Sequence, residues 1–181
     1  MYLTPLLARR LGALALALIP LCPAVVAQGY SDQSELYGAT ETSLDLFGSA
    51  AVGQQTLDHI TGLKLNRDFR LGAGAGLNYF FTRNLGVAAD AYTENIAHSF
   101  IDSASMNFIG RLPLGHSGFS PYLYGGFGRQ FDASEVWFGQ AGAGIEYRFS
   151  HQFGVFLDAR YVIPDGTANY GLGRLGFRCR F

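Results

Sequence analysis

Apolar and polar residues alternate with a period of two over several long segments of the chain. Within 137–149 every odd position is apolar or Gly, and the even positions after Phe138 are Gln, Gly, Gly, Glu and Arg. Successive side chains of a β-strand point to opposite faces, so this pattern predicts a strand with one apolar face. The same alternation occurs in 70–81, 153–163 and 171–181. A chain with this pattern is constrained to form β-sheet.

The composition excludes other classes of protein. Gly contributes 24 of the 181 residues, which argues against a helix bundle. Each Gly inside a helix costs about 1 kcal/mol relative to Ala. Charged residues make up 15% of the chain and aromatic residues 14%, the reverse of what a disordered chain needs. The 13 Lys and Arg nearly balance the 14 Asp and Glu, so nucleic acid is not an expected partner.

An internal repeat predicts how neighbouring strands pair. Residues 73–87, AGAGLNYFFTRNLGV, return 68 residues later as 141–155, AGAGIEYRFSHQFGV. Each copy has the form of a hairpin, with a three-residue turn at 82–84 or 150–152 between two strands. A short turn fixes the register, because a slip of one residue would invert both faces of the strand.

The alternating segments predict an all-β fold, an eight-stranded antiparallel transmembrane up-and-down β-barrel. Strands of roughly 10–13 residues exceed the soluble norm of about 5–6 and match a tilted span of the bilayer. In lipid the sheet must close, since no edge strand can stay unpaired. Long loops alternate with short turns, which places both termini in the periplasm. The expected strands are 42–50, 69–81, 85–95, 103–112, 119–130, 137–149, 153–163 and 170–181.

The face rich in Gly and charge is expected to point inward, opposite to a soluble barrel. An eight-stranded lumen is barely wide enough for side chains, so Arg and Glu fit there beside Gly. The outward face then carries small or aliphatic residues in mid-strand and aromatic residues at the ends, as membrane girdles require. For 119–130, which begins near Pro121, either face fits and the assignment stays open.

Residues 1–27 have the features of a secretory signal peptide that is cleaved ahead of Gln28. Arg9 and Arg10 precede a short uncharged apolar stretch. Cleavage would leave 11 Lys and Arg against 14 Asp and Glu, with Cys179 as the only cysteine. The alternative makes Cys22 a lipoprotein anchor, although Pro20 and Leu21 are not the small residues which that processing prefers. The domains are then 1–27 as signal, 28–41 as a polar lead-in and 42–181 as the barrel.

The end of the chain resembles the C-terminal assembly signal of bacterial outer-membrane barrels. This motif comprises Arg174, Gly176, Cys179 and Phe181, with Cys179 where an aromatic or aliphatic residue is usual. Together with the residue pattern of the hairpin around 144–161, it resembles the small eight-stranded barrels of the OmpA-like and opacity-like porin superfamily. That resemblance implies a bacterial outer-membrane location, insertion by the barrel assembly machinery, and a monomer in contact with outer-membrane lipid and lipopolysaccharide.

Charged residues recur at positions expected to point inward. We expect them to form an ion-pair network that plugs the lumen, because an unpaired ion there would be very costly. The alternative is a charged constriction that selects solutes. Glu146 and Asp158 are expected to pair with Arg160, Arg174 or Arg178. The set is Arg70, Asp90, Glu94, Arg111, Glu146, Arg148, Asp158, Arg160, Arg174, Arg178 and Arg180.

The sequence leaves three function classes open. The first is a structural or surface-interaction barrel, with recognition on loops such as 51–68. The second is a narrow porin-like channel past Gly72, Gly74, Gly76, Gly142 and Gly144. The third is a lipid-modifying enzyme, for which His98 and Ser99 near Glu94 come closest. No catalytic residue, cofactor or metal site is predicted, since His59, His98, His116 and His151 lack the spacing of metal ligands.

Overall fold

The computed structural model describes residues 36–53, 56–57, 64–65, 69–93, 101–115, 117–131, 135–166 and 168–181. No helix that could cross a bilayer occurs among them. The chain forms strands β1 (Glu41–Gly53), β2 (Thr56–Leu57), β3 (Lys64–Leu65), β4 (Arg70–Phe80), β5 (Leu85–Thr93), β6 (Ser103–Arg111), β7 (Phe119–Gln130), β8 (Val136–Arg148), β9 (Phe153–Pro164) and β10 (Tyr170–Arg180).

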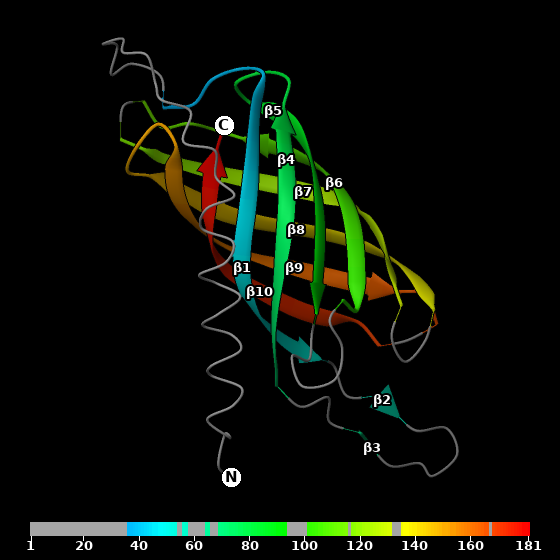
Figure 1. The fold of residues 1–181 in the computed structure, drawn as a ribbon. Helices are drawn as coiled ribbons and strands as arrows, with labels where there is room; N and C mark the ends of the chain where they lie inside the picture. The colour runs from blue at the N-terminus through cyan, green and yellow to red at the C-terminus, as the bar shows by residue number, and fades with distance from the viewer. Residues whose placement is uncertain are drawn as a thin grey trace. The chain divides into compact units, whose positions relative to one another are not determined.

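Eight of these strands close into an antiparallel barrel in the order β1-β10-β9-β8-β7-β6-β5-β4 (Figure 1). β2 and β3 form a separate two-stranded pair that the sequence pattern did not predict. The eight-stranded fold is confirmed, and each barrel strand lies within a few residues of its expected range. The largest difference is β1, which runs from Glu41 to Gly53 instead of 42–50. The predicted signal segment, 1–27, lies outside the described residues.

The barrel closes between its first and last strands. β1 pairs with β10 from Ser43 opposite Arg180 to Gly53 opposite Tyr170, and its other edge pairs with β4. Each barrel strand therefore has two neighbours and presents no open edge, as a sheet in lipid requires. The start of β1 and the end of β10 lie at the same end of the barrel (Figure 1), which we call the terminal end.

The two repeated hairpins use the same turn chemistry. The Thr82 hydroxyl accepts hydrogen bonds from the backbone N–H groups of Asn84 and Leu85, at 3.2 and 2.9 Å. The Ser150 hydroxyl accepts from Gln152 and from the N–H that begins β9, at 3.3 and 2.9 Å. A hydroxyl that satisfies nearby backbone donors favours a tight turn, so the two short turns lie where the repeat predicts them.

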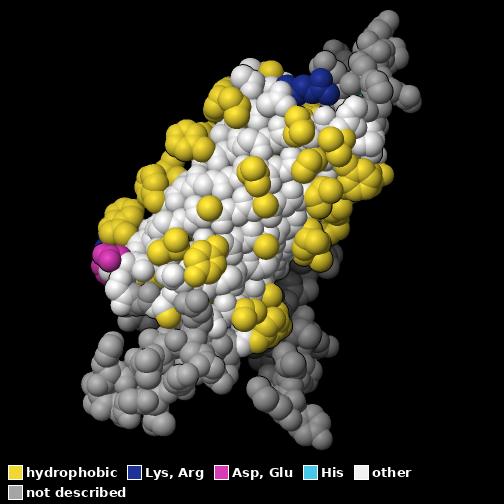
Figure 2. Space-filling view, turned by 180° about the vertical axis from the view of Figure 1, so that it is seen from behind, with side chains coloured by type: hydrophobic (Ala, Val, Ile, Leu, Met, Phe, Trp, Pro, Cys, Tyr) yellow, Lys and Arg dark blue, Asp and Glu magenta, His cyan; other side chains and the backbone are white. Residues whose placement is uncertain are grey.

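The outward face of the barrel is apolar, as expected. Large apolar side chains on every barrel strand are exposed there, among them Leu71, Leu123, Ile145, Leu157 and Leu175. Figure 2 shows hydrophobic side chains spread over the visible wall, with charged side chains only near its ends. Monomeric soluble proteins rarely expose contiguous apolar patches larger than a few hundred Å². This surface is suited to the lipid of a bilayer.

Inward-facing glycines on β8 make room for aromatic rings from β7. A Cβ on Gly142 would lie 2.5 Å from Cζ of Tyr124, and a Cβ on Gly144 would lie 2.6 Å from Cζ of Tyr122. Both Tyr side chains are buried. The question left open for 119–130 is thereby settled, because Tyr122 and Tyr124 point inward and Leu123 points outward.

Candidate functional site in the barrel interior

Four charged residues form what we call the middle layer of the interior: Asp90, Asp158, Arg160 and Arg174. Arg174 donates to Asp158 through Nε and Nη2, at 2.8 and 2.7 Å. Its Nη1 donates to Oδ2 of Asp90 at 3.2 Å. Arg160 donates to both Asp90 oxygens, at 3.2 and 3.0 Å. Two guanidinium groups thus balance two carboxylates.

Neutral side chains satisfy the remaining acceptors of the middle layer. The hydroxyls of Tyr122 and Tyr124 donate to the two oxygens of Asp158, at 2.7 and 3.1 Å. Ser105 donates to Asp90 at 2.8 Å. Gln140 accepts from Nη1 of Arg160 at 2.9 Å and donates to Ser105 at 2.8 Å. Buried polar groups are stable only when they are paired in this way.

A second cluster, the terminal layer, lies nearer the terminal end of the barrel. Arg178 donates to both oxygens of Asp45 at 2.7 Å and to Glu146 at 2.5 Å. Arg148 bridges Glu146 to Glu41. Charge alternates along this chain, and each carboxylate is shared or bidentate. The layer consists of Glu41, Asp45, Arg111, Glu146, Arg148 and Arg178.

The segment before β1 packs over the terminal layer. Tyr37 is 2% exposed, and its hydroxyl donates to the carbonyl of Gly118 at 2.7 Å. Its ring lies 4.9 Å from the Cζ atom of Arg111 and 4.2 Å from that of Arg148, within the range of cation–π contact. Burial raises the pKa of the Tyr37 phenol above its usual range. Tyr37 therefore holds the segment against the two arginines that flank Glu41.

The interior at the opposite end of the barrel combines apolar side chains with buried polar ones. Thr93 donates to Asp102 there at 2.8 Å, and Ser103 and Gln130 are buried as well. Tyr92, Phe138, Val162, Tyr170 and Leu172 are each at most 3% exposed. They lie near the ends of their strands that are remote from the chain termini. The described interior therefore passes from a mixed packing of apolar and polar side chains at one end, through the middle layer, to the terminal layer and Tyr37 at the other.

The structure places most of the predicted inward charges inside. Glu146, Asp158, Arg174 and Arg178 form the pairs that were expected for the two carboxylates, whereas Arg160 pairs with Asp90 instead. The buried members of the predicted set are Asp90, Arg111, Glu146, Arg148, Asp158, Arg160, Arg174 and Arg178.

The other three residues of the predicted inward set are not among the buried ones. The prediction for Arg70 is wrong, because it is the first residue of β4 and is exposed at the strand end. Arg180 is half-buried, with Nε 3.8 Å from Oε2 of Glu41. Glu94 lies outside the described residues. The alternation of inward and outward positions does not distinguish the end of a strand from its middle, which explains the error at Arg70.

Sequence reasoning missed Glu41 and Asp45, two of the three acids in the terminal layer. Glu41 lies in the segment 28–41 that the sequence predicts as a polar lead-in, and the expected strand 42–50 carries no prediction of which side chains face inward. The sequence does contain a pattern that marks the inward face of this strand, because Leu44 and Leu46 alternate with Ser43, Asp45 and Phe47. Inward residues of β1 are odd-numbered, whereas those of β4 and β8 are even-numbered.

The four predicted histidines lie mostly outside the described part of the chain. No group of three or more His, Cys, Asp or Glu that could hold a metal occurs there. His151 is exposed in a turn, and His59, His98 and His116 lie outside the described residues.

Gly176 faces inward, where a Cβ would lie 2.7 Å from Cβ of Phe47.

The C-terminal motif lies on β10 and the residue after it. Arg174 and Gly176 point inward, and Phe181 is exposed. Cys179 is half-buried, and no cysteine among the described residues has a free thiol. The other cysteine of the chain, Cys22, lies outside the described residues. The expectation of a single cysteine concerns the cleaved chain and stays a prediction. The role of the motif as an assembly signal also stays a prediction.

Comparison by sequence identifies no relative: no family model and no curated protein matches the chain. The structure is similar to the N-terminal β-barrel domain of Pseudomonas aeruginosa OprF, with a TM-score of 0.58 and 17% identity, covering 80% of this chain and 99% of that one. It is similar to Neisserial surface protein A (NspA), with a TM-score of 0.57 and 14% identity, covering 77% and 97%.

A de novo designed transmembrane β-barrel is as similar as these two, with a TM-score of 0.58 and 12% identity, covering 79% of this chain and 97% of that one. A natural and a designed barrel that match equally well share a fold and not an activity. The outward apolar wall, the inward charges and the closed order of strands agree with that likeness. The chain therefore has the fold of the eight-stranded transmembrane β-barrels of bacterial outer membranes.

Proposed function

We propose that this outer-membrane barrel keeps its lumen closed and serves a structural or surface-interaction role, without enzymatic activity. The observation that carries the proposal is the pair of ion-pair layers across the interior. Their five arginines are each bound to at least one acid at 3.2 Å or less. Moving a solute past them would break paired buried charges, each of which is costly to leave alone.

The porin-like alternative needs a water path past the inward glycines, and large side chains cover that path. A Cβ on Gly74 would lie 2.6 Å from the Phe47 ring and 2.6 Å from Cβ of Tyr92. Gly142 and Gly144 are covered in the same way by Tyr124 and Tyr122. Gly74, Gly142 and Gly144 therefore accommodate aromatic rings, whereas Gly72 lies against Ser49 and Gly76 against Asp90.

The cavity found between the two layers is small. A cavity of about 10 Å³ is lined by Asp45, Asn78, Asp90, Tyr122 and Arg174, among others. A single water needs roughly 10–15 Å³. A cavity of this size supports at most one trapped water, and it supports the closed lumen over the narrow channel.

The other possible functions depend on residues outside the barrel interior. Recognition of partners would use the loops at the end remote from the termini, of which 51–68 was the candidate. The enzyme alternative depends on Glu94, His98 and Ser99, which lie outside the described residues, so no geometry supports it. Outer-membrane lipid, lipopolysaccharide and the barrel assembly machinery remain the proposed partners of a monomeric barrel.

Conductance in planar bilayers tests the closed lumen. The mature barrel should show no steady channel openings. A matched variant, Asp158→Gly and Arg174→Gly with Glu146→Gly and Arg178→Gly, removes two acids and two bases, so it keeps the charge balance while it takes ion pairs out of both layers. This variant should conduct, provided that its heat-modifiable gel mobility shows a folded barrel. Steady openings by the unchanged protein would overturn the proposal, whatever the variant does.

A further inference from the structure

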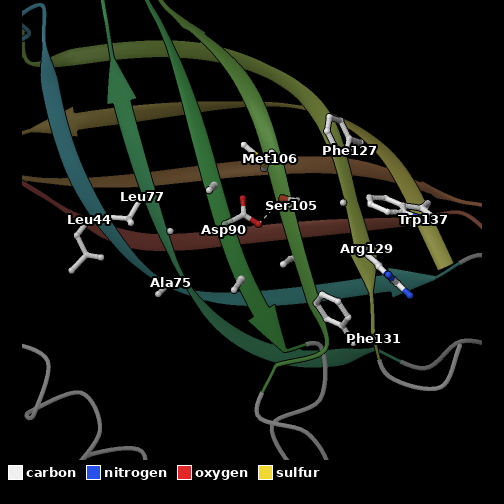
Figure 3. Close-up of a pocket in the computed structure, with 15 residues that line it drawn as sticks. Leu44, Ala75, Leu77, Asp90, Ser105, Met106, Phe127, Arg129, Phe131 and Trp137 are labelled. Carbon is white, nitrogen blue, oxygen red and sulfur yellow. Dashed lines mark hydrogen bonds between the residues drawn. The ribbon is translucent and has the colours of Figure 1, made fainter. Parts of the chain in front are cut away.

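The outward wall contains an open hollow of about 590 Å³ that the closed-lumen function does not use (Figure 3). Its floor includes three alanines that lie side by side on β4, β5 and β6. Ala75 is opposite Ala91, and Ala91 is opposite Ala104. Ala89 extends this floor of small residues, because it lies opposite both Leu77 and Met106.

Large apolar side chains frame the hollow. Leu44, Leu77 and Met106 border it toward the terminal end, and Phe127 continues that row, since Met106 is opposite Phe127. Phe131 and Trp137 border it toward the remote end (Figure 3). The hollow spans strands from β1 to β8. Its volume is suited to one or two acyl chains.

A single cation stands at the remote border of the hollow. Arg129 continues the alanine row, because Ala104 is opposite Arg129 and Arg129 is opposite Trp137. Its Cζ lies 5.8 Å from the centre of the Trp137 ring. Nη2 pairs with Glu135, and Nε is buried without a hydrogen-bond partner among the described residues. Arg carries five N–H donors, so this residue has donors left to bind an anion.

The position of Arg129 indicates which leaflet it faces. It lies one residue before the end of β7, at the end of the barrel remote from the termini. Connections at the terminal end include the short turns 81–84 and 149–152, and such turns lie on the periplasmic side. The remote end therefore faces the outer leaflet. A charge on the lipid face is tolerated near the interface, where it can reach a headgroup.

We propose that this hollow binds lipid A of the outer leaflet, with acyl chains over Ala75, Ala91 and Ala104 and a phosphate at Arg129. The proposal rests on the proposed outer-membrane orientation. An apolar hollow bordered by a cation complements an acylated phosphate, and the position of Arg129 toward the outer leaflet favours lipid A, the phosphorylated lipid of that leaflet. Arg129 binds the phosphate with the donors that Glu135 leaves.

A second outward hollow provides the control. It has a volume of about 350 Å³, lies nearer the terminal end, and is lined by apolar residues and Gly, including Phe81, Leu85, Leu123 and Gly125. No charged residue lines it. It fits an acyl chain and provides no anion contact, so filling it should not change the binding of a phosphorylated lipid.

Native mass spectrometry tests the site on the full mature barrel. The barrel is released from phosphatidylcholine nanodiscs that contain equal small amounts of lipid A and phosphatidylglycerol, and the retained lipids are counted. Lipid A should be retained in preference to both phospholipids. Arg129→Gln should lower its retention about tenfold, the change expected for one lost charge-assisted hydrogen bond. Ala104→Leu, which fills the floor, should lower it as well.

The control variant Gly125→Leu should retain lipid A like the unchanged protein, because its new side chain fills the second hollow. A Cβ there would meet no atom closer than 3.6 Å, so the variant should fold. Equal retention of phosphatidylglycerol and lipid A would overturn the choice of ligand. The proposed site would be wrong if Arg129→Gln retained as much lipid A as the unchanged protein. It would also be wrong if Gly125→Leu lost as much lipid A as Arg129→Gln. Conductance is measured separately, so an open lumen would leave this result unaffected.

Discussion

Arg178 and Asp45 lie directly opposite each other across the seam where β10 meets β1, and the guanidinium binds both carboxylate oxygens at 2.7 Å. Both side chains are buried inside the barrel. The strands that this pair joins are the first and last of the barrel. The pair therefore links the two ends of the sheet through the interior, in addition to the backbone hydrogen bonds of the seam.

Asp45→Ala should destabilise the barrel by about 3 kcal/mol, because it leaves Arg178 buried with only Glu146 as an acid. The free energy of unfolding in urea from lipid vesicles measures the effect, with fluorescence of the single Trp as the signal. Arg70→Gln is the control, since Arg70 is exposed. Its effect should stay within about 0.5 kcal/mol. Equal effects of the two variants would contradict the buried pair.

Gly144→Ala should destabilise the barrel, whereas Gly139→Ala on the same strand should not. A Cβ at Gly144 would lie 2.4 Å from Cβ of Asp158 and 2.6 Å from Cζ of Tyr122. A Cβ at Gly139 would meet nothing within 4 Å. Overpacking costs about 1–3 kcal/mol, so the same urea titration should separate the two variants. A difference below that range would mean that the ring of Tyr122 does not cover Gly144.

Tyr37 should make the barrel less stable at alkaline pH. Burial raises the pKa of its phenol, so above about pH 10 the unfolded chain loses a proton that the folded chain keeps. The free energy of unfolding should therefore fall as the pH rises past that value. Tyr37→Phe should weaken this fall and lower stability near neutral pH by about 1 kcal/mol, through the lost bond to Gly118. The same pH dependence in both proteins would exclude Tyr37 as its source.

The exported protein should begin at Gln28. Its intact mass, measured after purification from the outer membrane of an expressing bacterium, should correspond to residues 28–181 without lipid. A mass that includes Cys22 with attached acyl chains would favour the lipoprotein alternative instead. A mass of the complete chain would show that 1–27 is retained, and the predicted signal peptide would then be wrong.

The sequence predicted the strands well because lipid and a narrow lumen impose opposite demands on the two faces of each strand. Trp137, Ile145 and Tyr147 point outward and Glu146 points inward, as parity requires. The repeat at 73–87 and 141–155 also fixed both hairpin turns. These features depend on residues close in sequence, and one chain displays them directly.

The partners inside the barrel could not be predicted, because they join strands far apart in sequence. Asp45 meets Arg178 and Asp90 meets Arg160 only once the barrel has closed with its particular stagger. Tyr122 and Tyr124 were ambiguous for a related reason. Aromatic residues suit the outward girdle, and they also suit an interior where Gly142 and Gly144 leave room.

The most direct test of the membrane barrel uses its single Trp without any mutation. Trp137 lies on the outward face and is 58% exposed, so it should contact lipid in the folded protein. In vesicles, lipids brominated near the headgroup end of the acyl chain should quench its fluorescence strongly, and aqueous iodide should quench it weakly. Strong quenching by iodide together with no effect of brominated lipid would contradict the lipid-facing wall, and with it the account of the fold as a membrane barrel.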